Sequence, residues 1–256
     1  MLSLNSVSLA QTQPKASSLK NDPQAVQLLA SAFQAIGGGQ RAALADVRIE
    51  GTLRSPAAPD QIIGTFVAKV RGEDWALETT IGNRTNKFRV LNGSGTLDNG
   101  GSIKLFQPSI TSGTRLDLFP LFHRWTEFNQ PGSLAWGVGP TTLDGVACTQ
   151  IHVHSALTNL HPAESEQHGE IDVLVDFTSG LIAAIRYKAM LGMPNPHLIG
   201  IENRFAQYQR LGGLLMPTRI TRYLAGQPRT VFQVTAVQIN NGFTDQDFRN
   251  HGGNGQ

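Results

Sequence analysis

The last third of the chain is divided by turn residues into short strands, and this punctuation constrains the fold more than any other feature. The polar stretch Asp176–Leu181 predicts a turn between two strands. Gly212 and Gly213 mark another turn, after which a strand restarts towards Pro217. A final strand covers Val231–Asn240. The pattern predicts an antiparallel meander that ends a curved sheet.

One amphipathic helix is predicted ahead of the strands. Asp22 suits the N-cap and Pro23 suits the first helical position, while the glycines at 37–39 end the segment. The apolar residues that recur at helical spacing are Val26, Leu29, Phe33 and Ile36. We expect this stripe to pack on the concave side of the sheet.

Alternating apolar and polar residues predict strands through both halves of the chain. The expected strands are 47–53, 62–70, 75–81, 88–90, 103–105, 142–155, 169–177, 181–190, 199–210, 214–224 and 228–239. Gly51 and Gly64 interrupt two of them, and we expect these glycines to bend the sheet. The fold class is therefore mainly β (α+β), a curved antiparallel sheet with an N-terminal helix.

The middle of the chain carries large rings at every third position, in a segment interrupted by Pro120. This spacing predicts one or two short helices within 114–128. The helical plug either fills the core or acts as a movable lid over an apolar cavity. In the second case the ligand-binding residues are Phe66, Trp75, Leu77 and Phe88 on the sheet with Phe119, Phe122 and Trp125 on the lid.

Composition excludes several classes of protein. Charged residues make up 16% of the chain, and the net charge is +2. The sequence contains no block of like charges that would indicate a nucleic-acid-binding surface. Cys148 is the single cysteine, so no internal disulfide forms, and its strand context predicts a small buried hydrophobe. No apolar run reaches the roughly 18 residues of a membrane-spanning helix.

The chain is predicted to form a single domain over residues 22–249, with polar tails at 1–21 and 250–256. Residues 7–10 end in small side chains, like the cleavage end of a secretory signal, although a basic start is missing. Residues 1–21 are therefore either a disordered tail or the remnant of a signal peptide.

The histidines raise the question of a metal site. His152 and His154 are two apart on a predicted strand and so share a face, with His161 and His168 in the following loop. No His-Glu-x-x-His motif, cysteine pair or Gly-x-Ser-x-Gly motif accompanies them. We therefore expect no metal, no cofactor and no catalysis, and keep as an alternative a metal-assisted hydrolase that uses His152 and His154.

Three segments of the second half resemble the periplasmic lipoprotein-carrier (LolA-like) superfamily. Asp176–Leu181 is similar to its D-x-x-T/S-G-L turn, and Tyr208–Ile220 to its Y-x-x-x-x-G-x-x-x-P-x-x-I strand pair. Val237–Phe248 is similar to its closing V-x-x-N-x-x-x-x-D-x-x-F pattern. The resemblance implies a half-open β-barrel whose mouth is covered by helices. It also implies binding of acyl chains, lipoproteins or other apolar ligands in the cavity.

These observations together favour a non-catalytic binding protein of the cell envelope, periplasmic or secreted. Its expected partner is an apolar small molecule, a lipid or a lipoprotein, and not nucleic acid. We expect the protein to be a monomer. Peripheral contact with a membrane is compatible with these observations. The other alternative is an envelope sensor whose sheet binds a protein or peptide.

Overall fold

The computed structural model describes residues 21–37, 44–72, 74–106, 134–154, 170–191 and 197–249. These ranges hold one α-helix, α1 (Pro23–Gly37), one 13-stranded sheet and a short 3-10 helix, η4 (Asp245–Phe248). The strands are β1 (Val47–Ser55), β2 (Ala58–Arg71), β3 (Asp74–Ile81), β4 (Arg84–Leu91), β5 (Ser94–Asp98), β6 (Ile103–Phe106), β7 (Leu134–Leu143), β8 (Val146–His154), β9 (Glu170–Asp176), β10 (Ile182–Leu191), β11 (His197–Leu211), β12 (Leu214–Leu224) and β13 (Gln227–Ile239). No helix in these ranges is long and apolar enough to cross a membrane.

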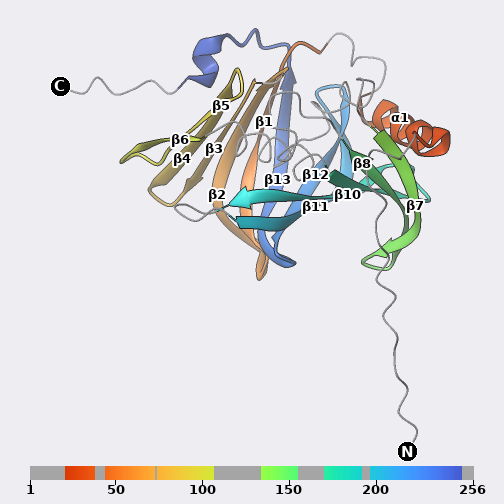
Figure 1. Ribbon diagram of the computed structural model, residues 1–256. Helices are drawn as coiled ribbons and strands as arrows, with labels where there is room; N and C mark the ends of the chain where they lie inside the picture. The colour runs from red at the N-terminus through yellow and green to blue at the C-terminus, as the bar shows by residue number, and fades with distance from the viewer. Residues whose placement is uncertain are drawn as a thin grey trace, which may run out of the picture.

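The sheet is antiparallel, with the order β6-β5-β4-β3-β2-β1-β13-β12-β11-β10-β9-β8-β7. The pairing of β1 with β13 joins the two halves of the chain, and β6 and β7 are left as the two edges. The sheet curves without closing, which gives a half-open barrel (Figure 1). The predicted fold class is thereby confirmed. The predicted helical plug at 114–128 lies outside the described residues.

Strand alternation gives the sheet two unlike faces. We call the side towards α1 the inner face; it carries the main core, which includes Ile49, Phe66, Ile185 and Phe232. The opposite side is the outer face, where charged residues on neighbouring strands pair, such as Arg186 with Glu202. The core therefore lies inside the curve of the sheet.

Gly51 and Gly64 lie where the backbone of a neighbouring strand leaves no room for a side chain. A Cβ at Gly51 would lie 2.0 Å from the carbonyl oxygen of Gln233, and a Cβ at Gly64 would lie 2.1 Å from that of Thr80. The register of β1 against β13 shifts between Glu50 and Gly51. This register shift fits the irregularity expected at Gly51, and both positions require glycine because only a residue without a side chain permits such contact.

The helix begins where the sequence predicts. The Asp22 carboxylate accepts a hydrogen bond from the Gln24 backbone N–H at 2.9 Å, and Pro23 follows as the first helical residue. The Asp22 backbone N–H also donates to the carbonyl oxygen of Ala135 at 2.8 Å, and Asn21 accepts from the Ala135 N–H at 2.9 Å. These bonds fix the start of α1 on the edge strand β7.

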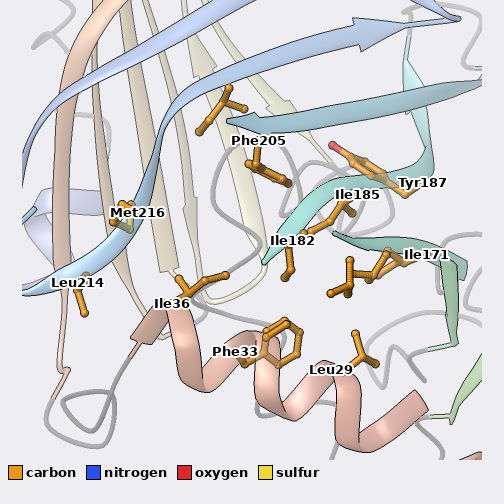
Figure 2. Packing of buried hydrophobic residues seen from close by; sticks show 14 of the residues in the cluster. Leu29, Phe33, Ile36, Ile171, Ile182, Ile185, Tyr187, Phe205, Leu214 and Met216 are labelled. Carbon is orange, nitrogen blue, oxygen red and sulfur yellow. The ribbon is translucent and has the colours of Figure 1, made fainter. Parts of the chain in front are cut away.

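The buried stripe of α1 differs by one residue from the prediction. Leu29, Phe33 and Ile36 point from the helix into the core towards Ile171, Ile182 and Ile185 (Figure 2). Val26 is 38% exposed, and Ala25 and Ala32 occupy the interface in its place. The small alanines let the helix lie close to β7 and β12, the two strands that it contacts most.

The prediction of one strand over 142–155 is wrong, because this segment turns. Asp144 and Gly145 both have positive φ, 49° and 84°, as a two-residue hairpin turn requires, so β7 ends before them and β8 starts after them. Most of β7 was not predicted, since Gly137, Gly139 and Pro140 argue against a strand interior. The structure accommodates them because β7 is an edge strand with a register shift between Gly137 and Gly139.

The C-terminal segment packs on the outer face of β2 to β4. Lys69 and Arg71 of β2 hold Asp247 and Asp245 of η4, each at 2.7 Å. Phe248, which is 2% exposed, packs under the Arg71 guanidinium, 5.1 Å from the ring centroid. The C-terminal segment therefore packs on the outer face of these strands and does not cover their inner face.

Candidate ligand-binding face

The structure brings the four sheet residues of the predicted ligand site onto one face of three adjacent strands. Leu77 of β3 lies directly opposite Phe88 of β4 on one side and Ala68 of β2 on the other. Trp75 is two residues before Leu77 and so shares its face, and Phe66 is two residues before Ala68. All four side chains therefore belong to the inner face.

The rings on this face form two contacts of different character. Trp75 and Phe88 stack with centroids 4.9 Å apart and planes at 24°, and both are half-buried. Phe66 meets Phe232 edge to face at 5.2 Å and is 1% exposed. Phe66 therefore belongs to the fixed core, whereas the Trp75–Phe88 stack is an accessible apolar surface beside it.

The indole nitrogen of Trp75 is the polar group of this surface. Nε1 is buried and has no hydrogen-bond partner among the described residues. A buried Trp N–H usually finds an acceptor, since leaving one unpaired has a free-energy cost of about 1–3 kcal/mol. An acceptor atom of a bound molecule would satisfy it.

The described elements cover the sheet unequally. α1 contacts β7 and β12, and η4 contacts β3 and β4 from the outer face. Figure 1 shows α1 beside β7 and β8, away from β4 to β6 at the other side of the sheet. The predicted lid residues Phe119, Phe122 and Trp125 lie outside the described residues, so their place over this surface stays a prediction.

A cavity of about 660 Å³ opens between the start of α1 and the inner face of β7 to β9. Its lining is largely apolar and includes Ala25, Leu28, Pro140, Ile151 and Val175. This volume lies within the usual range of sites for small ligands, roughly 300–1,000 Å³. The inner face is therefore not completely filled where the helix meets the edge strand.

Two polar residues of the inner face were not predicted. Asn203 is fully buried between Ile201 and Phe205 of the core, and it lies directly opposite Arg222. The sequence carries a signal for them, because each stands at a position where the alternation along β11 and β12 predicts a residue of the inner face. Arg222 thus brings a positive charge to a face that is mainly apolar.

The two candidate metal-binding histidines share the outer face, as predicted from their spacing, but both are buried. His152 is 7% exposed and His154 is 9% exposed. Nδ1 of His152 donates to the Asp172 carboxylate at 2.6 Å, since a carboxylate can only accept, and the Trp136 ring packs 4.3 Å from the imidazole. No group of three metal-ligating side chains occurs among the described residues; His161 and His168 lie outside them.

Cys148 is a buried packing residue of the outer face. It is 2% exposed and contacts a small cluster with Leu143, Leu174 and Ala184. Burial raises the pKa of its thiol, and the negative charge of Asp176 acts in the same direction. Both effects disfavour the reactive thiolate, as predicted for a small buried hydrophobe.

The sequence matches no family model. It also matches no curated protein. Solved structures do match. A LolA superfamily protein from Nitrosomonas europaea has a TM-score of 0.55 at 11% identity, over 88% of this chain and 97% of that one.

Two further structures support the same fold. A DUF1329 family protein from Desulfovibrio piger has a TM-score of 0.54 at 11% identity, over 90% of this chain and 98% of that one. A domain named for outer membrane lipoprotein sorting, from Vibrio parahaemolyticus, has a TM-score of 0.50 at 10% identity, over 88% and 96%. At such low identity the likeness concerns the fold alone. The chain has a LolA-like fold, which confirms the resemblance drawn from its turn motifs.

Proposed function

We propose that the protein is a non-catalytic binding protein of the cell envelope that holds an apolar ligand against the inner face of its half-barrel. The ligand is a lipid, an acyl chain or the acyl part of a lipoprotein. The observation that carries the proposal is the half-buried Trp75–Phe88 stack on the inner face. A ring pair of this kind offers a large, rigid apolar surface with little conformational entropy to lose on binding.

The ligand surface combines a fixed floor with accessible side chains. Phe66 and Ala68 are almost fully buried and form the floor, while Trp75, Leu77 and Phe88 remain half-buried beside them. We include Phe119, Phe122 and Trp125 in the proposal as the residues that close the site. Large rings at every third position are more apolar bulk than an exposed segment carries without cost.

The proposed ligand has a polar atom near its apolar part. The buried Nε1 of Trp75 has no acceptor among the described residues, and the carbonyl oxygen of an ester or amide would provide one. A pure hydrocarbon would leave this donor unpaired. We therefore expect acyl esters or amides to bind more tightly than alkanes of the same length.

The fold is consistent with this role, because one structure with the same fold is named for outer membrane lipoprotein sorting. Fold likeness does not by itself carry function, so the proposal depends on the inner face. It places the protein in the periplasm or outside the cell, as a monomer that contacts a membrane peripherally when it takes up or delivers its ligand.

Native mass spectrometry of protein purified without detergent tests the proposal directly. We expect a bound mass that organic solvent extracts and that fragments as an acyl compound. Displacement of the fluorescent probe N-phenyl-1-naphthylamine by palmitate gives a second, quantitative readout. Bound zinc lost on replacing His152 and His154 would instead favour the metal-assisted hydrolase, and a bound peptide would favour the sensor. A protein that binds neither probe nor lipid would disprove the proposal.

A further inference from the structure

A second cavity, of about 370 Å³, lies on the outer face, on the opposite side of the sheet from the apolar surface. It is built on a row of residues that face one another directly across six neighbouring strands, β7 to β12. The row is Trp136, His152, Asp172, Arg186, Glu202 and Tyr223. The residue just before the row on each of the first five strands belongs to the inner core, namely Ala135, Ile151, Ile171, Ile185 and Ile201, so the row itself projects to the outer face.

Hydrogen bonds and ring contacts hold both parts of the row, and the neighbouring Arg204 contributes to them. At one end the Trp136 ring packs on His152, whose Nδ1 donates to Oδ1 of Asp172 at 2.6 Å. At the other end Arg186 and Arg204 both donate to the carboxylate of Glu202. The side chains that line the cavity are thereby fixed in place before any ligand binds.

The row is interrupted at its centre. Asp172 and Arg186 lie directly opposite each other, yet no ion pair joins them in the described structure. Oδ2 of Asp172 accepts no hydrogen bond from a described residue, and the two Nη groups of Arg186 have no acceptor there. An acceptor and a pair of donors therefore face the same cavity without engaging each other.

The charge of the cavity lining is balanced. Three acidic side chains, Glu170, Asp172 and Glu202, meet three basic ones, Arg186, Lys188 and Arg204. A site for an anion or a cation would carry an excess of the opposite sign. Balanced charges that are fixed in place suit a neutral ligand with many hydrogen-bonding groups.

Gly200 leaves part of the cavity floor open. It lies in β11, and a Cβ built on it would meet nothing within 4 Å. The ring of Tyr223 borders the same space and has the Arg204 guanidinium 4.2 Å from its centroid. The floor is therefore flat backbone, with one aromatic ring to contact the C–H groups of a ligand.

We propose that this outer cavity binds a saccharide unit through two neighbouring hydroxyl groups. One hydroxyl donates to Oδ2 of Asp172, and its neighbour accepts from an Nη group of Arg186. Two hydroxyl groups on adjacent carbons can make both hydrogen bonds at once, and they thereby link Asp172 to Arg186 across the gap in the row. The cavity volume, near the lower end of the usual range for ligand sites, fits one or two sugar rings.

Saturation-transfer NMR with the intact protein tests the proposal, with maltotriose and the N-acetylglucosamine trimer as probes. We expect transfer to at least one of them at millimolar concentration, strongest at the ring protons beside the bound hydroxyls. Gly200→Leu should abolish the transfer, because the new side chain enters open space without displacing the backbone. Asp172→Asn should weaken it at least tenfold. Lys87→Ala, on the outer face of β4, is the matched control and should bind as the wild type does.

Three results would overturn the proposal. They are no transfer to either sugar, unchanged binding in Gly200→Leu, and competition by inorganic phosphate that shows an anion site instead. A thermal melt of each variant establishes that it is folded. The probe N-phenyl-1-naphthylamine should bind Gly200→Leu normally, since the two sites lie on opposite faces. This readout separates failure of the saccharide site from failure of the apolar one.

Discussion

Trp75 stacks on Phe88 across neighbouring strands, with ring centroids 4.9 Å apart and planes inclined by 24°. The two are diagonal neighbours, because Trp75 lies opposite Val90 and Phe88 lies opposite Leu77. Diagonal pairs of large side chains are within reach of each other in an antiparallel sheet. Their half-buried rings extend the apolar core towards β4 and make an inner surface that a ligand can use.

Removal of one ring should weaken apolar binding. Phe88→Ala removes the face on which Trp75 stacks, and we expect the affinity for N-phenyl-1-naphthylamine to fall about 5- to 30-fold, the equivalent of about 1–2 kcal/mol. The control is Lys87→Ala, which changes the adjacent outer-face residue and an exposed ion pair that contributes little. Fluorescence titration measures both. Equal affinity in the two variants would place the ligand elsewhere.

Filling the surface should exclude the ligand without unfolding the protein. Leu77 lies between Ala68 and Phe88 on the inner face, so Leu77→Trp places a second indole where the ligand chain is proposed to lie. We expect a clear loss of probe binding. Glu78→Trp adds the same ring to the outer face one residue away and should bind normally. If both variants bind the probe like the wild type, the inner face of β3 is not part of the site.

The sequence predicted those elements whose signals are local. Asp22 and Pro23 located the start of the helix, and Gly51 and Gly64 marked two strand positions that admit no side chain, because each signal follows from the chemistry of the residue itself. The four sheet residues of the site share a face for the same reason, since their positions are related by alternation and by hairpin pairing.

The remaining features depend on tertiary contacts. Whether Val26 or Ala25 faces the core is decided by how closely α1 approaches the sheet, and helical spacing alone allows either. Pro140 and the neighbouring Gly137 and Gly139 argue against a strand in this segment. The strand β7 forms there because it lies at the edge of the sheet. The pairing of His152 with Asp172 joins residues 20 positions apart, so no local motif announces it.

The packing of α1 can be measured by a pair of substitutions. Phe33 is 6% exposed in the core and Val26 is 38% exposed on the same helix. Phe33→Ala should lower the free energy of unfolding by about 3–5 kcal/mol through lost burial and a residual cavity. Val26→Ala should change it by less than about 1 kcal/mol. Urea unfolding followed by circular dichroism gives both values, and similar losses would mean that α1 is not seated as described.

Two glycines of the sheet should respond oppositely to the same substitution. Gly51→Ala forces a Cβ to within 2.0 Å of the Gln233 carbonyl oxygen, so β1 and β13 must separate at the register shift between them. We expect a loss of at least 2 kcal/mol, of the order seen for overpacked cores. Gly200→Ala meets open space and should be neutral or slightly stabilising, since alanine restricts the unfolded chain. Thermal melts that show equal effects would contradict the close backbone contact described at Gly51.

Acid should release the C-terminal segment through Asp46. Its carboxylate accepts hydrogen bonds from the backbone N–H groups of Asn241 at 2.6 Å, Gly242 at 2.8 Å and Phe243 at 3.1 Å. Burial by itself raises the pKa of Asp46, but these bonds and one from the Asn241 side chain outweigh it and hold the pKa below its ordinary value.

The ionised form of Asp46 therefore stabilises the fold above the unfolded-state pKa, about 3.9, and this contribution is lost as the pH falls through the lower folded-state pKa. Asp46→Asn should lower stability at pH 7 by about 1–3 kcal/mol, because the neutral amide cannot accept all these hydrogen bonds. The difference between wild type and variant should shrink below about pH 4. Chemical unfolding at pH 7, 5 and 3 tests this, and a difference that stays constant with pH would show that ionisation of Asp46 does not anchor the segment.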